Sequence, residues 1–243
     1  MQSRDYTEMG GTGGAFLTTH WSLIENVKKQ PDQDRALIGL LLERYWKPVY
    51  CYLRQKGYDN EQAKDLTQGF FTEKVLGQDL AAKADREKGR FRSFLLRAAR
   101  NYAISVRRAG RMHLSLDDDH EVEDARGNPE TEFNRAWADG LLQEVLEELE
   151  QECRERNKLT HWHVFHDWLL EPQIEQKKEA MDRICVRYGV PDASTAYHMI
   201  ENVKRRFRSI LRDRLSTLVG SEEEIKMEIR DFIDIFSAGP ART

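Results

Sequence analysis

The hydrophobic positions of this chain recur at helical spacing, and no stretch shows the convincing alternation of a β-strand. In "DRALIGLLLERYWKPVYCYLRQKGY" the apolar pattern is interrupted at Pro48 and closed by Gly57. "DNEQAKDLTQGFFTEKVL" follows as a second helix, with Asp59 or Asn60 as its capping residue. The pattern predicts an all-α protein.

Helical spacing resumes in the second half of the chain with "FNRAWADGLLQEVLEELEQECRER", and two more helices follow "LTHWHVFHDWLLEP". Between the halves, "LSLDDDHEVEDARGNP" carries acids, Gly and Pro with little hydrophobic pattern. We therefore expect two small helical domains joined by an acidic flexible linker. The predicted ranges are a flexible leader 1–18, a first domain 19–112, the linker 113–135, a second domain 136–219 and an acidic extension 220–243.

The end of the second predicted domain contains two helices around a short turn. Met181, Ile184, Cys185 and Tyr188 share one helix face, and Gly189 to Pro191 form the turn. Asp192 is the expected N-cap of the longer helix that follows. The buried stripe of that helix is Ala196, Ile200, Val203, Phe207 and Leu211. The pattern predicts a helix-turn-helix, in which the second helix enters the major groove.

The formal net charge of −4 conceals strongly segregated blocks. Residues 86–111 hold nine Lys or Arg and one acid, a net +8, and residues 204–214 hold six bases and one acid, a net +5. Between them, residues 117–152 hold fourteen acids and two arginines, a net −12. Two separated basic blocks are typical of a protein that contacts a polyanion at two places. The acidic block would be repelled by that ligand, or would mask the basic faces in its absence.

The first basic block, "RFRSFLLRAARNYAISVRR", predicts a helix with one apolar and one cationic side. The expected buried face is Phe91, Phe94, Leu95, Ala98, Tyr102 and Val106. The opposite face carries every arginine and no acid, although like charges spaced four residues apart repel each other. A phosphate backbone relieves that repulsion, and guanidinium groups suit bidentate phosphate contacts. The helix is therefore predicted to contact nucleic acid.

Several other features exclude classes of protein. No run reaches the length of a membrane span, and the start of the chain does not resemble a signal peptide. The three cysteines are far apart and fit reduced thiols. No phosphate loop or nucleophile motif is evident. We expect a cytoplasmic protein without membrane contact, cofactor or enzymatic activity.

The residues of the first domain resemble those of bacterial RNA polymerase sigma factors of the extracytoplasmic-function group. "DLTQGFF" is similar to the D-L-x-Q-x-x-F motif of the family, and "FLLRAARNYAISVRR" to its W-L-x-R-I-A-x-N-x-x-x-D-x-x-R pattern, with Phe94 at the Trp position and Ser105 in place of Asp. "TTHWSLI", "DLTQGFF" and "GRFRSFLL" are similar to a subgroup common in planctomycete-type bacteria. The family joins two helical domains by a flexible linker.

The resemblance implies that core RNA polymerase and promoter DNA are the partners, and it leaves open whether an anti-sigma factor binds. The implied polymerase-binding residues are Asp65, Leu66, Gln68 and Phe71. The residues implied to open the −10 element and hold its unstacked bases are Arg90, Phe91, Arg92, Phe94, Arg97, Arg100, Asn101, Arg107 and Arg108. Core packing is the competing interpretation for Phe91 and Phe94.

The second domain departs from the family pattern, because Tyr197, Met199 and Asn202 stand where Lys, Arg and Arg are common. Recognition of a −35 element, or of its usual sequence, is therefore in doubt. Candidates for base edges are Thr195, Tyr197, His198 and Asn202, and candidates for phosphates are Lys204, Arg205 and Arg208.

Two other functions compete with this hypothesis. "HWHVFHDW" suggests a metal-dependent enzyme, but only His163 and His166 share a helix face, and a metal needs a third ligand. A sigma-like protein that binds polymerase or DNA without opening promoters is the second alternative. The acidic, amphipathic segment 221–236 is either a packing helix or a cover for a basic surface in cis.

Overall fold

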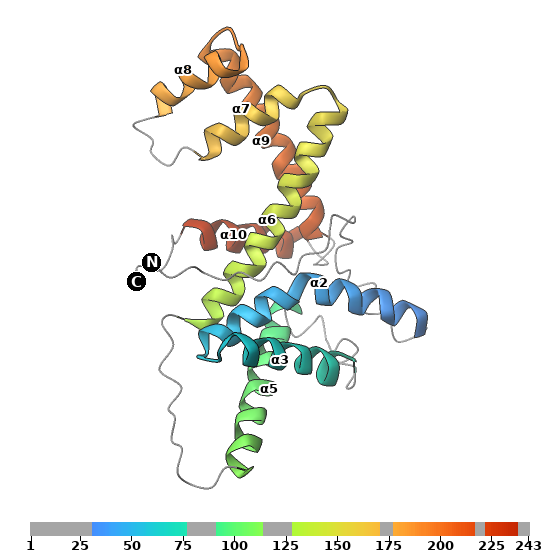
Figure 1. The fold of residues 1–243 in the computed structure, drawn as a ribbon. Helices are drawn as coiled ribbons and strands as arrows, with labels where there is room; N and C mark the ends of the chain where they lie inside the picture. The colour runs from blue at the N-terminus through green and yellow to red at the C-terminus, as the bar shows by residue number, and fades with distance from the viewer. Residues whose placement is uncertain (1–30, 77–90, 114–127, 171–176, 217–221, 238–243) are drawn as a thin grey trace.

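The computed structural model describes residues 31–76, 91–113, 128–170, 177–216 and 222–237, and every element in these ranges is helical. This part of the chain confirms the all-α prediction. The helices are α2 (Pro31–Gln55), α3 (Asn60–Phe70), the π-helical turn η1 (Phe71–Leu76), α5 (Phe91–His113), α6 (Pro129–Glu155), α7 (Leu159–Leu170), α8 (Lys177–Tyr188), α9 (Ala193–Ser216) and α10 (Glu222–Ser237). Figure 1 shows α2, α3 and α5 at one end of the molecule and α7 and α8 at the other, with α6 running between them.

Helix α2 continues through Pro48, where the sequence predicted an interruption. The proline removes one backbone donor, which costs the helix a hydrogen bond. Its neighbours compensate, because Tyr45, Val49 and Tyr52 are buried on the side that faces the core. Gly57 ends the helix as predicted, with a φ of 93° that favours glycine.

Helix α3 begins at a capping box. The Asp59 carboxylate accepts a hydrogen bond from the Gln62 backbone N–H at 2.8 Å, and the Gln62 side chain accepts one from the Asp59 N–H at 3.2 Å. Farther along, Gly69 lies against α5, and a Cβ atom at this position would lie 2.4 Å from the Tyr102 hydroxyl. The glycine therefore allows α5 to approach α3 closely.

Helix α6 connects the two ends of the molecule. It begins at Pro129 with Asn128 as its N-cap, inside the range that the sequence assigned to the linker. Near its start, Phe133 is stacked on Tyr45 of α2, with 6.5 Å between ring centroids. Farther along, its buried residues face α7 and α9. Residues 129–135 therefore lie in a packed helix in the structure.

A single hydrophobic cluster includes residues from both halves of the chain. Leu41 and Leu95 from the first half and Ile200 and Leu215 from the second are completely buried, and α6 contributes residues such as Val145 between them. The described helices thus share a core through α6. The predicted division into two domains stays a prediction.

Helices α8 and α9 meet at the turn that the sequence predicted. Gly189 has a φ of 64°, and the Val190 N–H donates to the Cys185 carbonyl at 2.9 Å, which closes the end of α8. Asp192 caps α9 by accepting a hydrogen bond from the Thr195 N–H at 2.7 Å. Of the predicted stripe on α9, Ala196, Ile200, Val203 and Leu211 are buried and Phe207 is half-buried.

Candidate nucleic-acid interface

Helix α5 buries a face slightly rotated from the predicted one. Its buried apolar residues are Phe91, Leu95, Ala99, Tyr102 and Ala103, whereas Phe94, Ala98 and Val106 are half-buried. Gly69 on α3 makes room for Tyr102 on this buried face, because a Cβ atom there would clash with the Tyr102 hydroxyl. Tyr102 also donates a hydrogen bond to Glu73 of η1 at 3.3 Å, which restrains the orientation of the tyrosine ring.

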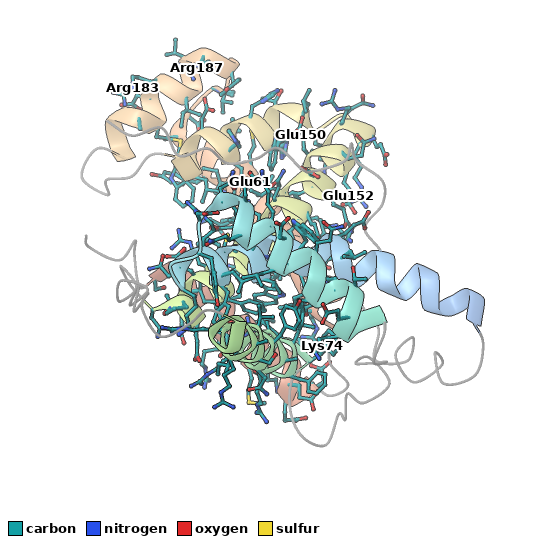
Figure 2. The ribbon with its side chains drawn as sticks, turned by 60° about the horizontal axis from the view of Figure 1, so that its bottom comes forward. Glu61, Lys74, Glu150, Glu152, Arg183 and Arg187 are labelled. Atoms are coloured by element: carbon teal, nitrogen blue, oxygen red, sulfur yellow. The ribbon has the colours of Figure 1, made fainter. Side chains whose placement is uncertain are left out.

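The outer side of α5 presents arginines to solvent. Arg97, Arg107 and Arg108 are exposed, and none of them pairs with a carboxylate among the described residues. Arg100 is more than half exposed and lies 3.6 Å from Glu130. Figure 2 views α5 nearly end-on, and nitrogen-tipped side chains project from it away from the other helices.

Two uncharged residues share this outer side with the arginines. Asn101 is exposed, and Ile104 is 42% exposed although it is aliphatic. An amide that can read base edges and an apolar side chain that can contact bases therefore lie within an acid-free cationic surface. We call Arg97, Asn101, Ile104, Arg107 and Arg108 the α5 surface.

Arg92, which the resemblance also assigns to DNA contact, does not lie on the α5 surface in this structure. The Arg92 side chain is only 8% exposed, and its guanidinium lies 4.0 Å above the Trp137 ring. One of its nitrogens is 3.0 Å from an Asp231 oxygen and 3.4 Å from a Glu228 oxygen. The first turn of α5 faces α6 and α10, so Arg92 lies inside the protein in this conformation.

Phe91 is also buried, which favours core packing over base contact. Its ring meets Tyr45 edge-on at 5.7 Å and lies 6.2 Å from the half-buried ring of Phe94. Arg90 falls outside the described residues. The residues implied to contact DNA therefore separate into a buried first turn and an exposed remainder.

The predicted polymerase-binding residues divide in the same way. Asp65 and Gln68 are exposed on α3, and Leu66 is half-buried. Phe71 is 2% exposed and stacks on Trp46 with 5.9 Å between centroids, so it contributes to the core and not to an outer surface. Asp65 and Gln68 are three residues apart on a helix and so share one exposed face.

The predicted base-reading residues of α9 lie mostly on its outer side. Tyr197 is 44% exposed, His198 and Asn202 are exposed, and Thr195 is half-buried. Asn202 accepts a hydrogen bond from Arg205 at 3.2 Å, which orients both side chains. These residues are brought together on one helix.

The predicted phosphate-binding residues of α9 differ in whether their charges already have partners within the protein. Arg205 and Arg208 are exposed. Lys204 instead lies 4.2 Å above the Trp168 ring and 2.9 Å from the Glu201 carboxylate. Its charge is already engaged within the protein, and Glu201 places an acid on the same side of the helix.

The other arginines of α9, which are Arg206, Arg212 and Arg214, bind carboxylates. Arg206 donates to Glu152 at 2.6 Å, and Arg214 donates to Glu148 at 2.9 Å, both across the interface with α6. The hydrogen bond from Arg206 holds the pKa of Glu152 below its usual range. Glu144, Glu148 and Glu152 repeat every four residues in the sequence, a stripe that could have predicted an ion-paired face.

Two opposing effects set the pKa of Glu144, which is more buried than Glu152. Burial raises its pKa despite a hydrogen bond of 2.9 Å from Arg44 of α2 and the nearby Arg214. These pairs connect α2, α6 and α9. The acidic block that the sequence associated with masking thus does engage basic residues, chiefly those of α9.

The histidines of α7 do not converge on a common point. His163 is stacked on Tyr188 at 5.5 Å, whereas His166 lies 5.4 Å from the Trp162 ring and 3.7 Å from Asp167. Among the described residues, no group of three or more His, Cys, Asp or Glu is placed to hold a metal ion.

Burial raises the pKa of the Cys51 thiol to about 11, which keeps it protonated at neutral pH.

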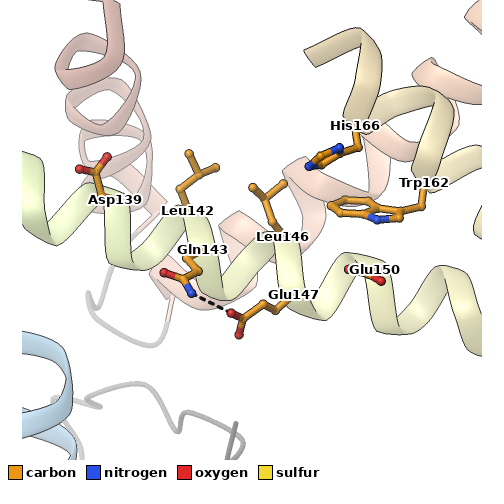
Figure 3. A pocket seen from close by; sticks show the side chains of 8 residues that line it. All are labelled: Asp139, Leu142, Gln143, Leu146, Glu147, Glu150, Trp162 and His166. Carbon is orange, nitrogen blue, oxygen red and sulfur yellow. Dashed lines mark hydrogen bonds between the residues drawn. The ribbon is translucent and has the colours of Figure 1, made fainter. Parts of the chain in front are cut away.

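An open pocket of about 240 Å³ lies between α6 and α7. Figure 3 shows Leu142 and Leu146 beside Trp162 and His166. Its remaining lining residues are Asp139, Gln143, Glu147 and Glu150. The carboxylates give this pocket a charge opposite to that of the α5 surface, so it does not suit a phosphate.

No helix in the described ranges has the length and apolar character to cross a membrane. Comparison of the chain with family models, with curated proteins and with solved structures finds no match.

Proposed function

We propose that this chain is a transcription initiation factor that binds core RNA polymerase and directs promoter recognition and opening. The observation that carries the proposal is the α5 surface, where Arg97, Arg107 and Arg108 are exposed and free of carboxylate partners among the described residues. Such a surface relieves its own repulsion when it neutralises phosphates and releases their counterions. Asn101 and Ile104 add the side-chain types that hold unstacked bases.

The exposed face of α3 supports a contact with polymerase. Asp65 and Gln68, which resemble the polymerase-binding motif of the sigma factors, point outward from a helix that is held by its capping box. A rigid, accessible helix face is what a protein partner needs, because little conformational entropy is lost on binding.

The α8–α9 pair supports a second contact with duplex DNA. Its turn at Gly189 and its outward-facing Tyr197, His198 and Asn202 are suited to a helix-turn-helix that reads the major groove. Arg205 and Arg208 provide cations for the flanking phosphates. Glu201 weakens that contact, so we expect the α5 surface to dominate the affinity for DNA.

Run-off transcription with purified core polymerase tests the proposal. Asp65→Ala with Gln68→Ala should abolish co-purification with polymerase, because both changes fall on the exposed face of α3. Gln151→Ala with Glu155→Ala is the matched control, since it removes an amide and a carboxylate from an exposed helix face elsewhere. Loss of polymerase binding in both double variants, or in neither, would contradict the role of α3.

A sigma-like regulator that binds polymerase without opening promoters is the second candidate. The burial of Phe91 and Arg92 favours it, because these residues are implied to act on the opened strand. Permanganate reactivity of promoter thymines separates the two functions. Enhanced reactivity with polymerase and the wild-type chain supports promoter opening, and polymerase binding without enhanced reactivity supports the second candidate.

A further inference from the structure

Helix α10 carries a carboxylate in the middle of its buried face. Ile225, Ile229 and Phe232 follow the spacing of an apolar stripe that packs toward α6 and α9. Glu228 lies within this stripe and is only 3% exposed. A buried acid is costly unless it is paired, so its presence at a core position calls for a specific partner.

That partner is Arg92, which the resemblance assigns to promoter contact. Glu228 and Asp231, one turn apart on α10, approach the same nitrogen of Arg92 at 3.4 and 3.0 Å. Trp137 of α6 covers the guanidinium from another side at 4.0 Å. The contact joins residues far apart in the sequence, since Arg92 lies in the first turn of α5 and Asp231 in α10.

The opposing energies of this contact nearly cancel, which allows the contact to form and break reversibly. Removing the Arg92 guanidinium and the Glu228 carboxylate from water costs about as much as their attraction returns, and Asp231 stays partly exposed. The compensation is incomplete here, because the other terminal nitrogen of Arg92 is buried and has no hydrogen-bond acceptor among the described residues. Separation would return these groups to water, or would give Arg92 a phosphate in exchange.

A polar contact at the start of α10 is of the exposed kind that stabilises little. Glu222 pairs with Arg212 at 2.6 Å, but both side chains are about half exposed. Arg135 lies over the Phe236 ring at 5.1 Å. The apolar stripe of α10 and the contact of Glu228 with Arg92, by comparison, are buried.

We propose that α10 competes in cis with promoter DNA for Arg92, so that α10 must leave the first turn of α5 before this turn contacts the DNA strand. The inference rests on the proposed function, because it gives Arg92 the DNA contact that the resemblance implies. The exposed α5 surface would make the first contact with DNA. Exchange of the α10 carboxylates for phosphates at Arg92 would then extend that contact toward the start of the helix.

The test compares two charge-neutral substitutions on the same helix. Glu228→Gln with Asp231→Asn removes both carboxylates from Arg92 and keeps the side-chain shapes. Glu223→Gln with Asp234→Asn removes the same charge from exposed positions of α10 and is the control. Affinity for a fluorescent forked DNA with a single-stranded arm is measured by anisotropy at about 0.1 M salt, where phosphate contacts still contribute strongly. We expect at least about a fivefold gain for the first variant and less than about twofold for the control.

Hydrogen exchange of the wild-type chain gives a readout that needs no variant. On addition of the forked DNA, amides of α10 should exchange faster, while those of α7 should not change. Equal affinities of the two variants, or α10 amides that stay equally protected with DNA bound, would overturn the proposal. A first variant that does not fold leaves the exchange measurement to decide.

Co-purification with core polymerase is measured in parallel for the wild type and both variants. Polymerase binding and transcription with equal DNA affinities would contradict the α10 mechanism and leave the proposed function standing. A selective gain in DNA affinity without any polymerase binding would support the competition by α10 and contradict the proposed function. The two failures are therefore distinguishable.

Discussion

Two arginine-rich segments of the chain look alike in sequence, because each lies toward the end of an amphipathic helix. One contains Arg107 and Arg108 of α5, and the other contains Arg206 and Arg214 of α9. The structure uses them differently. Arg107 and Arg108 are exposed without a carboxylate partner among the described residues, whereas Arg206 and Arg214 bind the stripe of glutamates on α6. A basic run thus indicates a nucleic-acid surface only where the fold leaves it without acids.

The same contrast recurs within α5 itself. Arg92 and Arg97 are five residues apart on one helix, but the first is enclosed by Trp137 and two acids and the second is exposed. Only the first turn of the helix faces α6 and α10. Helix α5 therefore has a buried first turn followed by a segment whose arginines are exposed.

Neutralising the α5 surface should have the largest effect. Arg97→Gln, Arg107→Gln and Arg108→Gln together should lower the affinity for forked DNA by at least about thirtyfold at about 0.1 M salt, because phosphates that are no longer neutralised keep their counterions. The slope of log affinity against log salt should become shallower by roughly 0.7 to 0.9 for each such phosphate. Unchanged affinity would contradict the assignment of this surface, and an unchanged unfolding midpoint confirms that the fold is intact.

Arg214→Gln should act on stability instead. The change leaves Glu148 without its cation and leaves Glu144 with Arg44 alone, so the free energy of unfolding should fall by about 1 to 2 kcal/mol. Arg205→Gln, an exposed position on the same helix, is the control and should change it by less than about 0.5 kcal/mol. Equal losses in the two variants, measured by urea unfolding, would remove the distinction between them.

The acid sensitivity of the α6–α9 interface should depend on Glu152. Its pKa lies below the ordinary 4.5 in the folded protein, so its contribution to stability is present above that value and is lost as the pH falls further. Glu152→Gln should therefore reduce the loss of stability as the pH falls below about 4.5. Urea midpoints that fall equally with acid in the wild type and the variant would contradict this assignment.

Glu201→Gln should produce the smallest effect. The change removes an acid from the outer side of α9 and releases Lys204 from its ion pair of 2.9 Å. We expect roughly a twofold gain in affinity for duplex DNA, because a single exposed charge contributes little. Glu155→Gln on α6 is the control, and a larger gain there would argue against DNA contact by α9.

Local features of the fold could be predicted well from the sequence. Asp59 and Asp192 cap their helices and Gly57 and Gly189 end theirs, because these signals act between residues a few positions apart. The continuation of α2 through Pro48 could not be predicted, because packing of its neighbours offsets the missing hydrogen bond.

The candidate site was predictable as a set of arginines but not as a surface. The sequence by itself determined the helices, their amphipathic faces and the segregation of charge, since each of these depends on the order of residues along one helix. Only the tertiary structure decided which cations stay exposed, because Arg92 meets Glu228 and Asp231, and Arg214 meets Glu148, through contacts between distant segments. Those contacts depend on how α6 and α10 pack against the rest, which no local pattern specifies.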